Sequence, residues 1–267
     1  MKRISSEPSY VLHSYAWSES SLILEVFTRN HGRIALVAKG AKRPSSNFRP
    51  ILLPLQPLHL AFGGDAEIRT LKSAEWMGGH VMPGGDALMS GYYLNELLMK
   101  MLARDDAHPR LFDVYASVIH VVAGRQGEAL QAALRVFELS LLREIGLLPA
   151  LSLQTMTLEP VAAGVRYTLV PEGGLRQSGE GDRHGLDGEQ WLTLHRAMAK
   201  DTSETGVPFT TLLCACSEVM DALKPQLRTL LNYHCGVETF KTRQMMIDIQ
   251  KISHVGLSEP AFSQTVK

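Results

Sequence analysis

Two kinds of hydrophobic periodicity divide the chain near residue 82. Before this point, short apolar runs rich in β-branched and aromatic residues alternate with turn residues, a pattern that predicts β-strands. The predicted strands are Tyr10–Trp17, Leu22–Thr28, Arg33–Ala38, Leu58–Phe62 and Glu67–Leu71. Turn chemistry such as Asn30-His31-Gly32 separates them, because glycine supplies the positive φ that tight turns need.

The connection between the third and fourth predicted strands is long and contains three prolines. Pro44, Pro50 and Pro54 lie between Lys39 and Gln56, and proline cannot donate a hydrogen bond to a sheet. We therefore expect this segment to cross one end of the sheet. Five short strands in about 75 residues, with one long link, fit a small closed barrel of the OB type. An open β-sandwich fragment is the alternative.

Beyond residue 82 the apolar residues recur at three- and four-residue spacing, which predicts helices. The predicted helices are Leu88–Ala103, Pro109–Ala123, Glu128–Leu147, about Gly188–Ala199, and Phe209–Tyr233. Pro225 lies inside the last of these, where we expect a kink or a break. Two β-like runs, Thr155–Leu158 and Val165–Val170, precede a loop at Gly173–Gly188. No periodicity is visible from Ser253 onward.

These patterns predict an α+β protein with two domains and a tail. We expect a five-stranded OB-fold β-barrel at residues 1–81, a mainly α-helical domain with a small β-like insertion at residues 82–252, and a flexible tail at residues 253–267. The 267 residues are 45% hydrophobic and 20% charged, which is ordinary for a globular protein.

Positive charge is concentrated in the predicted barrel, although the formal net charge of the chain is zero. Residues 1–81 contain ten Lys or Arg and six Asp or Glu, a net of +4, so the remainder carries −4. Six cations and no acidic residue lie between Glu25 and Asp65: Arg29, Arg33, Lys39, Lys42, Arg43 and Arg49. This clustering predicts a patch for a polyanion. Ordinary variation of surface charge is the alternative.

The sequence contains no export, membrane or catalytic signature. Polar residues from Ser5 to Pro8 interrupt the apolar run that a signal peptide needs. The most apolar stretch, Ile145–Leu158, is shorter than the roughly 18 residues of a membrane span. The odd number of cysteines, three, fits a reducing cytosol, and their spacing is not that of a zinc site. We expect a cytoplasmic protein with no metal, cofactor or catalytic residue.

Aromatic residues accompany the basic run, as they do in OB barrels that bind single strands. The candidates are Tyr15, Trp17, Phe27, Phe48 and Phe62. At least half of them should belong to the barrel core. Phe48, in the proline-rich link between Asn47 and Arg49, is the least core-like, so we expect it to lie near nucleic acid.

Several sequence blocks follow one another in a characteristic order and spacing. They include Val11–Leu22, Leu36–Pro44, Leu55–Leu58, Tyr93–Leu98, Leu134–Leu142 and Ala222–Pro225. Together they resemble the bacterial recombination-mediator family RecO, over residues 10 to about 250. Phe240-Lys241-Thr242-Arg243 is similar to the Lys-Ser-Arg element near the carboxyl end of the family, with Thr242 in place of serine.

The resemblance implies a non-enzymatic role in DNA repair and recombination. Family members bind single- and double-stranded DNA, anneal complementary strands and, with RecR, help RecA load onto gaps coated by single-strand-binding protein. They also bind the acidic, hydrophobic-ended tail of single-strand-binding protein through the helical domain. Arg135 matches the basic block used there, and a solvated helix face is the alternative for it. The location implied is cytoplasmic and nucleoid-associated.

Four further cations are candidate accessory DNA contacts, or they lie at helix ends. They are Lys224, Arg228, Lys241 and Arg243. Some relatives carry a four-cysteine zinc module, but residues 150–190 contain no cysteine, so we expect no zinc. Two alternatives to a DNA-binding mediator stay open. An RNA-binding OB protein would discriminate through 2′-OH contacts, and a cryptic enzyme would need a pocket that gathers His, Ser or Cys.

Overall fold

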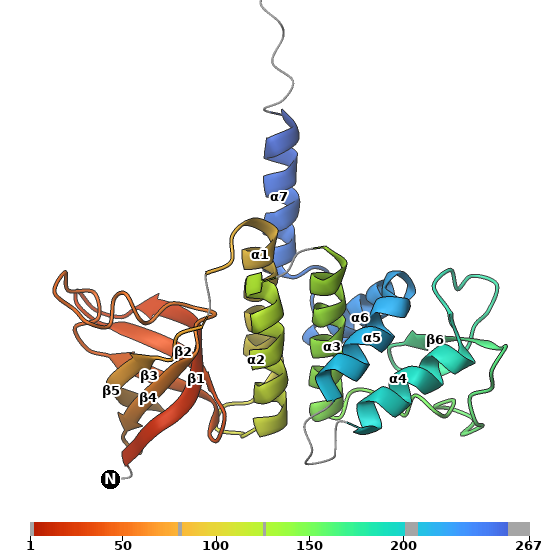
Figure 1. Cartoon of the computed structure of the whole chain (residues 1–267), viewed down its shortest axis with the longest axis horizontal. Helices are drawn as coiled ribbons and strands as arrows, with labels where there is room; N and C mark the ends of the chain where they lie inside the picture. Colours follow the sequence, from red (N-terminus) through yellow and green to blue (C-terminus); the bar gives the residue numbers. More distant parts are fainter. Residues whose placement is uncertain (1–2, 80–81, 125–126, 201–207, 256–267) are drawn as a thin grey trace, which may run out of the picture.

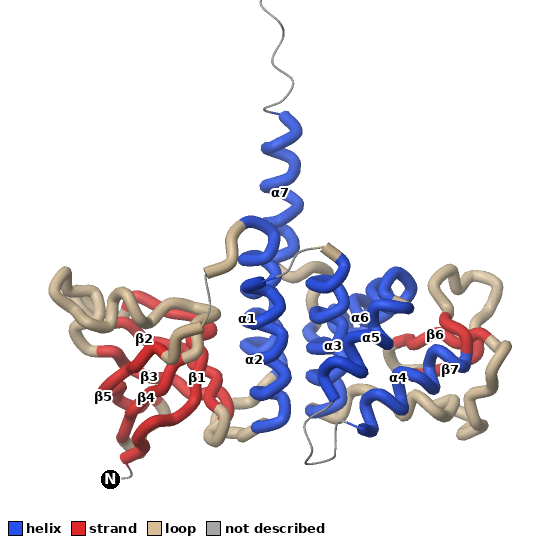
Figure 2. Tube along the Cα trace, in the orientation of Figure 1, coloured by secondary structure: helices blue, strands red, loops and turns tan. Residues whose placement is uncertain are grey.

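The computed structural model describes residues 3–79, 82–124, 127–200 and 208–255. A five-stranded barrel lies at one end of an elongated molecule, helices fill the middle, and a small sheet lies at the other end (Figures 1 and 2). The barrel strands are β1 (Arg3–Ala16), β2 (Leu22–Thr28), β3 (Gly32–Ala38), β4 (Leu58–Gly63) and β5 (Ile68–Trp76). They close in the order β1-β2-β3-β5-β4, with β3 and β5 parallel. The predicted OB-type barrel is confirmed.

Two barrel strands are longer than the sequence pattern predicts. β1 begins at Arg3 rather than Tyr10, because residues Arg3–Ser9 pair with β4. The polar residues of this segment conceal the strand in the sequence. β5 continues to Trp76, which pairs with Leu58 at the start of β4.

Seven helices are seen in the described ranges. They are α1 (Gly85–Met101), α2 (Pro109–Gly124), α3 (Glu128–Glu144), α4 (Gly188–Lys200), α5 (Pro208–Glu218), α6 (Met220–Cys235) and α7 (Lys241–Val255). The predicted break at Pro225 is wrong in position, since α5 ends before Val219 and α6 runs through Pro225. Pro225 is the sixth residue of α6, so the helix continues past it without the hydrogen bond that an amide there would donate to the Asp221 carbonyl. α7 passes the expected start of the tail at Ser253, and residues 256–267 lie outside the described ranges.

The small sheet contains β6 (Arg166–Val170) between β7 (Gly174–Gln177) and β8 (Leu186–Asp187). The last two strands lie in the segment that we expected to be a loop. The predicted strand Thr155–Leu158 is wrong. This segment forms an exposed turn, in which the Leu158 amide donates to the Gln154 carbonyl at 2.9 Å, so it has no buried face.

The barrel and the helices share one apolar core in addition to the core inside the barrel. Tyr10 and Phe27, on the outer face of β1 and β2, pack with Phe112 and Tyr115 of α2, and ring centroids lie 5.0 to 5.9 Å apart. Burial of these rings removes a large apolar area from water and fixes the barrel against the helices. In the described part of the chain, no helix is long and apolar enough to cross a membrane.

Candidate nucleic-acid interface and a basic pocket

The two ends of the barrel differ in what they contact. The β2–β3 turn lies against the α1–α2 connection, where the Asp105 amide donates to the Arg33 carbonyl at 2.9 Å. At the opposite end lie the tip of the β1–β2 hairpin, the long link of residues 39–57 and the end of β5. We call this second end the link end.

Two of the six predicted DNA-binding cations lie at the helical end of the barrel and are engaged in ion pairs. Arg29 donates two hydrogen bonds to Asp113 of α2, at 2.9 and 2.8 Å, and this contact raises the pKa of Arg29. Arg33 lies 3.4 Å from Glu25, and the same carboxylate pairs with Arg104. These contacts join the barrel to the helices, so the structure separates Arg29 and Arg33 from the other four cations.

The other four predicted cations gather at the link end. Lys39, Lys42, Arg43 and Arg49 are exposed there, and β5 adds a fifth exposed cation, Lys72. In the described part of the chain, none of these five forms an ion pair. We call them the link-end cations. Unpaired, exposed charges of one sign produce a strong local potential for an anion.

A hollow of about 480 Å³ lies between the link and β5. Lys39, Arg43 and Phe48 line it from the link and Lys72 lines it from β5. The Phe48 ring is half-buried and packs against the barrel core, with its remaining surface facing the hollow. Lys72 is not among the cations that the sequence singled out, because it lies beyond the acid-free run, which ends at Asp65.

The five candidate aromatic residues range from completely buried to mostly exposed, with Phe48 in between. Phe27 and Phe62 are completely buried, whereas Tyr15 and Trp17 are 45% and 64% exposed. The expectation that at least half of the five would belong to the barrel core is wrong, since Phe62 is buried in that core, Phe48 is only partly buried there, and Phe27 packs on the outer face against α2. Trp17 is more exposed than Phe48, which the sequence had suggested as the least core-like of the five.

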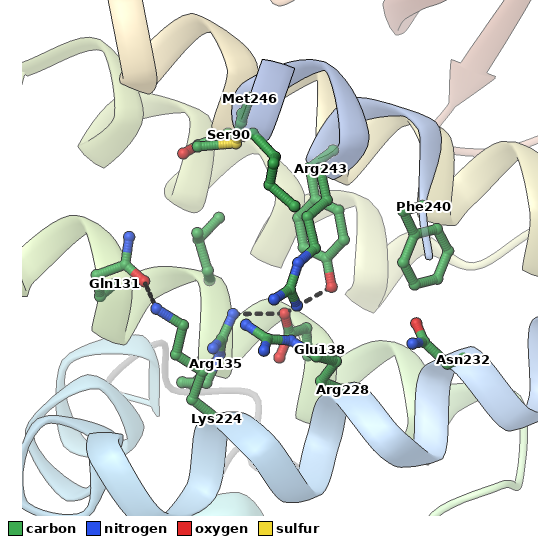
Figure 3. Close-up of a pocket in the computed structure, with 13 residues that line it drawn as sticks. Ser90, Gln131, Arg135, Glu138, Lys224, Arg228, Asn232, Phe240, Arg243 and Met246 are labelled. Carbon is green, nitrogen blue, oxygen red and sulfur yellow. Dashed lines mark hydrogen bonds and ion pairs between the residues drawn. The ribbon is translucent and has the colours of Figure 1, made fainter. Parts of the chain in front are cut away.

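A second cavity, of about 320 Å³, lies among α1, α3, α6 and α7. Four cationic side chains line this cavity, and Figure 3 shows three of them, all arginines, around the carboxylate of Glu138, whereas Lys224 points to Gln131. The four cations are Arg135, Lys224, Arg228 and Arg243. Apolar side chains also line the cavity, among them Leu134, Phe240, Met246 and Ile247. We call this cavity the basic pocket.

The floor of the basic pocket is a buried hydrogen-bonded group. Arg135 donates to Glu138 at 2.6 Å, and the Tyr93 hydroxyl donates to the same carboxylate oxygen at 2.8 Å. Burial raises the pKa of Glu138 although Arg135 opposes this shift. Within the ranges that the structure describes, Arg135 Nε and the second Glu138 oxygen are buried without a hydrogen-bond partner, so the floor has unused donor and acceptor capacity there.

Mutual repulsion among the cations shows in their pKa values. Burial, then the charges of Arg135 and Arg228, lower the pKa of Lys224. Burial, then Arg243 and Arg135, lower the pKa of Arg228. Four cations around one carboxylate leave an excess of positive charge in a partly desolvated space. A bound anion would relieve this repulsion, so the pocket suits an anionic ligand with an apolar part.

The structure brings Arg135 together with three of the four accessory cations that the sequence suggested. Lys241 is the exception, because it starts α7 with its backbone amide bonded to Glu96 of α1 at 2.9 Å. Arg135 is 4% exposed, so it is not a solvated surface residue. Periodicity could not reveal the pocket, since its four walls come from segments far apart in the chain.

The described residues contain no group of three His, Cys, Asp or Glu side chains that could hold a metal ion. Cys214 and Cys216 lie in α5, where Cys216 is buried and Cys214 is exposed. Burial raises the pKa of the Cys216 thiol to about 12, which disfavours the thiolate that a metal or a nucleophilic reaction requires.

The closed barrel, its link-end cations and the helical body with a basic pocket define a two-part α+β protein of the OB-barrel class. Residues 1–80 match the family model "Recombination protein O N terminal", and residues 83–164 match "Recombination protein O C terminal". The chain belongs to the RecO family.

Curated relatives with the name "DNA repair protein RecO" align along nearly the whole chain. The relative from Albidiferax ferrireducens is 69% identical over 252 residues, which cover 94% of this chain and 98% of the relative. The relative from Variovorax paradoxus is 63% identical and that from Polaromonas naphthalenivorans 62% identical, and the alignments cover 94% of this chain and 98% and 99% of the two relatives. The resemblance found in the sequence is confirmed.

Proposed function

We propose that this protein is a non-enzymatic DNA repair and recombination mediator. In this role it binds single- and double-stranded DNA, anneals complementary strands and, with RecR, helps RecA load onto gaps coated by single-strand-binding protein. Family membership supports the repair role. The observation that carries the DNA-binding part is the group of five unpaired cations on one end of an OB barrel.

The link-end cations contact DNA phosphates in this proposal, and Phe48 lies beside the DNA path in the hollow. Neutralised phosphates release counterions and repel a second strand less, so annealing proceeds without ATP. If the five cations each contact one phosphate of single-stranded DNA, log affinity should fall against log salt with a slope of about −3.5, from roughly −0.7 per contact. Arg29 and Arg33 have no part in this set because of their ion pairs.

A double variant tests the phosphate contacts. Replacement of Lys42 and Arg43 by alanine should weaken binding to all sequences alike and make the salt slope shallower by about 1.4, since two contacts are lost. The matched control is Arg110→Ala with Arg183→Ala, two exposed arginines on the helical body. Fluorescence anisotropy over a salt series measures both slopes. An unchanged slope in the Lys42/Arg43 variant would exclude the link end as the phosphate site.

The basic pocket is the proposed receptor for the acidic, hydrophobic-ended tail of single-strand-binding protein. Its cations match the acidic residues of such a tail, and Phe240, Met246 and Ile247 provide an apolar wall. Arg228 is a better test residue than Arg135, because breaking the buried Arg135–Glu138 pair would destabilise the fold.

The measurement for the pocket is calorimetric titration with single-strand-binding protein, intact or without its tail. Arg228→Ala with Arg243→Ala should reduce affinity for the intact protein at least tenfold, the loss expected for two partly desolvated charge contacts of about 1 kcal/mol or more each. DNA affinity of the same variant at moderate salt should stay within about twofold, because the link end is intact. Equal binding of the tailless protein would contradict the proposal.

A further inference from the structure

Three ring-bearing side chains occupy alternate positions on β1 and on the hairpin that follows it. They are His13, Tyr15 and Trp17, and all three are exposed. The Tyr15 and Trp17 side chains leave 45% and 64% of their surface in water. Large aromatic side chains that gather on a surface usually mark a binding site. We call these three residues the β1 ladder.

A shift in strand pairing turns the β1 ladder toward solvent. Val11 pairs with Val26, and both are buried in the barrel core, whereas His13 pairs with Glu25 on the next step of β2. Leu12 is therefore an extra residue, and such a bulge reverses the side that later residues face. Glu25 faces away from the barrel core, so His13 shares that outer face.

The outward alternation continues to the hairpin tip. The Trp17 amide donates to the Ser21 carbonyl at 3.2 Å, which extends the β1–β2 pairing by one more step. Alternate residues of a strand are about 6.7 Å apart along the backbone, so the three side chains form a row along one side of the hairpin, parallel to which an extended single strand can lie. The rings of His13 and Tyr15 also touch edge to face, with centroids 4.5 Å apart, which restrains Tyr15.

The surface around the β1 ladder is suited to nucleic acid. Tyr15 lies beside Ile23 of β2, which lies beside Val37 of β3, so a half-exposed apolar row crosses the outer face of the barrel. Lys42 joins the long link to the hairpin tip, because its Nζ donates to the Ser18 carbonyl at 2.8 Å. The hairpin that carries Trp17 therefore contacts a cation that has no acidic partner among the described residues.

We infer that, given the DNA-binding role proposed above, the β1 ladder stacks against the bases of single-stranded DNA. Aromatic side chains and bases stack regardless of sequence, because every base has a π-face. Bases of a duplex are not available for this contact, so the ladder favours single strands over duplexes. The link-end cations hold the backbone, and Tyr15 and Trp17 hold the bases.

The test compares two ligands with the same backbone charge: an oligo(dT) of about 16 nucleotides and an oligonucleotide of equal length made of abasic residues. Tyr15→Ala and Trp17→Ala should each lower affinity for oligo(dT) about tenfold, the loss expected for one stacked base, and leave affinity for the abasic strand unchanged. Tyr15→Phe and Trp17→Phe should restore most of the affinity, and Met156→Ala, which changes another exposed side chain, should have no effect.

The outcomes separate this inference from the proposed function. If the wild-type protein binds both strands with the same affinity and the expected salt slope, the β1 ladder does not stack on bases, although the phosphate contacts stand. If the wild-type protein binds neither oligonucleotide, both the base stacking by the β1 ladder and the proposed DNA-binding role are overturned. If the alanine variants lose affinity equally for the two oligonucleotides, the base-stacking role of the β1 ladder is also overturned, because such a loss would indicate a change in the barrel itself.

Discussion

Tyr10 is buried at the interface between the barrel and the helices, and this burial changes its pKa. It is 3% exposed and packs on Phe112 and Tyr115, and burial raises its pKa to about 12. In the unfolded chain, tyrosine ionises near pH 10. The stability that neutral Tyr10 contributes is therefore complete below about pH 10 and is lost as the pH rises toward about 12.

This shift leads to a prediction for alkaline conditions. The free energy of unfolding should fall between about pH 9 and pH 11, and Tyr10 should account for about 1 kcal/mol of that loss. Tyr10→Phe should reduce the loss by this amount, because phenylalanine cannot ionise in either state. Urea unfolding at the two pH values measures it. An identical pH dependence in wild type and variant would contradict the assigned burial.

Position 32 requires glycine, because the backbone of Asp106 lies against it. The φ of Gly32 is +66°, and a Cβ atom there would lie 1.8 Å from the Asp106 carbonyl oxygen. Gly32→Ala should destabilise the protein by about 3 kcal/mol or more, measured by urea unfolding, from the positive φ and the clash together. Gly236→Ala is the matched control, since its φ is +61° with nothing within 4 Å, and it should cost only about 1 kcal/mol.

Among the elements, α7 depends on one carboxylate of another helix. Glu96 of α1 accepts the Lys241 amide at 2.9 Å and both the amide and hydroxyl of Thr242, at 2.9 and 2.7 Å. This contact caps the first turn of α7 and places a negative charge at the positive end of its dipole. Figure 1 shows the far end of α7 projecting beyond the other helices, whereas its first turns lie beside α1 and line the basic pocket.

Loss of this cap should loosen α7. Glu96→Ala should increase hydrogen exchange at amides of α7, by an amount equivalent to about 1 to 2 kcal/mol, while α3 stays protected. Asp248→Ala, which removes an exposed carboxylate from the middle of α7, is the control and should leave exchange nearly unchanged. If the α7 amides exchange at the same rate in both variants, the Glu96 contact does not stabilise α7.

The sequence predicts the order and type of most elements, because their apolar periodicity directly reflects burial. The sequence pattern does not predict a strand that forms only by pairing with a distant segment. Residues 3–9 are an example, since they are polar but pair with β4. The site shows the same limit. Charge clustering brought forward Lys39 and Arg43 together with Arg29 and Arg33, and it could not show that the last two have acidic partners, which include Asp113, 84 residues away from Arg29. The basic pocket required the packing of four helices.

At the scale of the whole molecule, the shared core couples the barrel to the helices. Tyr10, Leu12, Phe27 and Leu55 belong to the same buried cluster as α1, α2 and α3. Calorimetric unfolding of the complete chain should therefore show one cooperative transition. A fragment of residues 1–81 should aggregate or unfold at lower temperature, because those four side chains would be exposed. Two well-separated transitions in the complete chain would contradict this coupling.

The extra residue at Leu12 has a further consequence for how this surface can change between related chains. Which side chains of the hairpin meet water depends on a count of residues, not only on their identity. A deletion of Leu12 would leave every ring in the sequence and yet turn Tyr15 and Trp17 to the opposite face of the hairpin, where Ser14 and Ala16 now lie. Alignments that compare residue types alone would miss such an event, whereas the length of this one strand would reveal it.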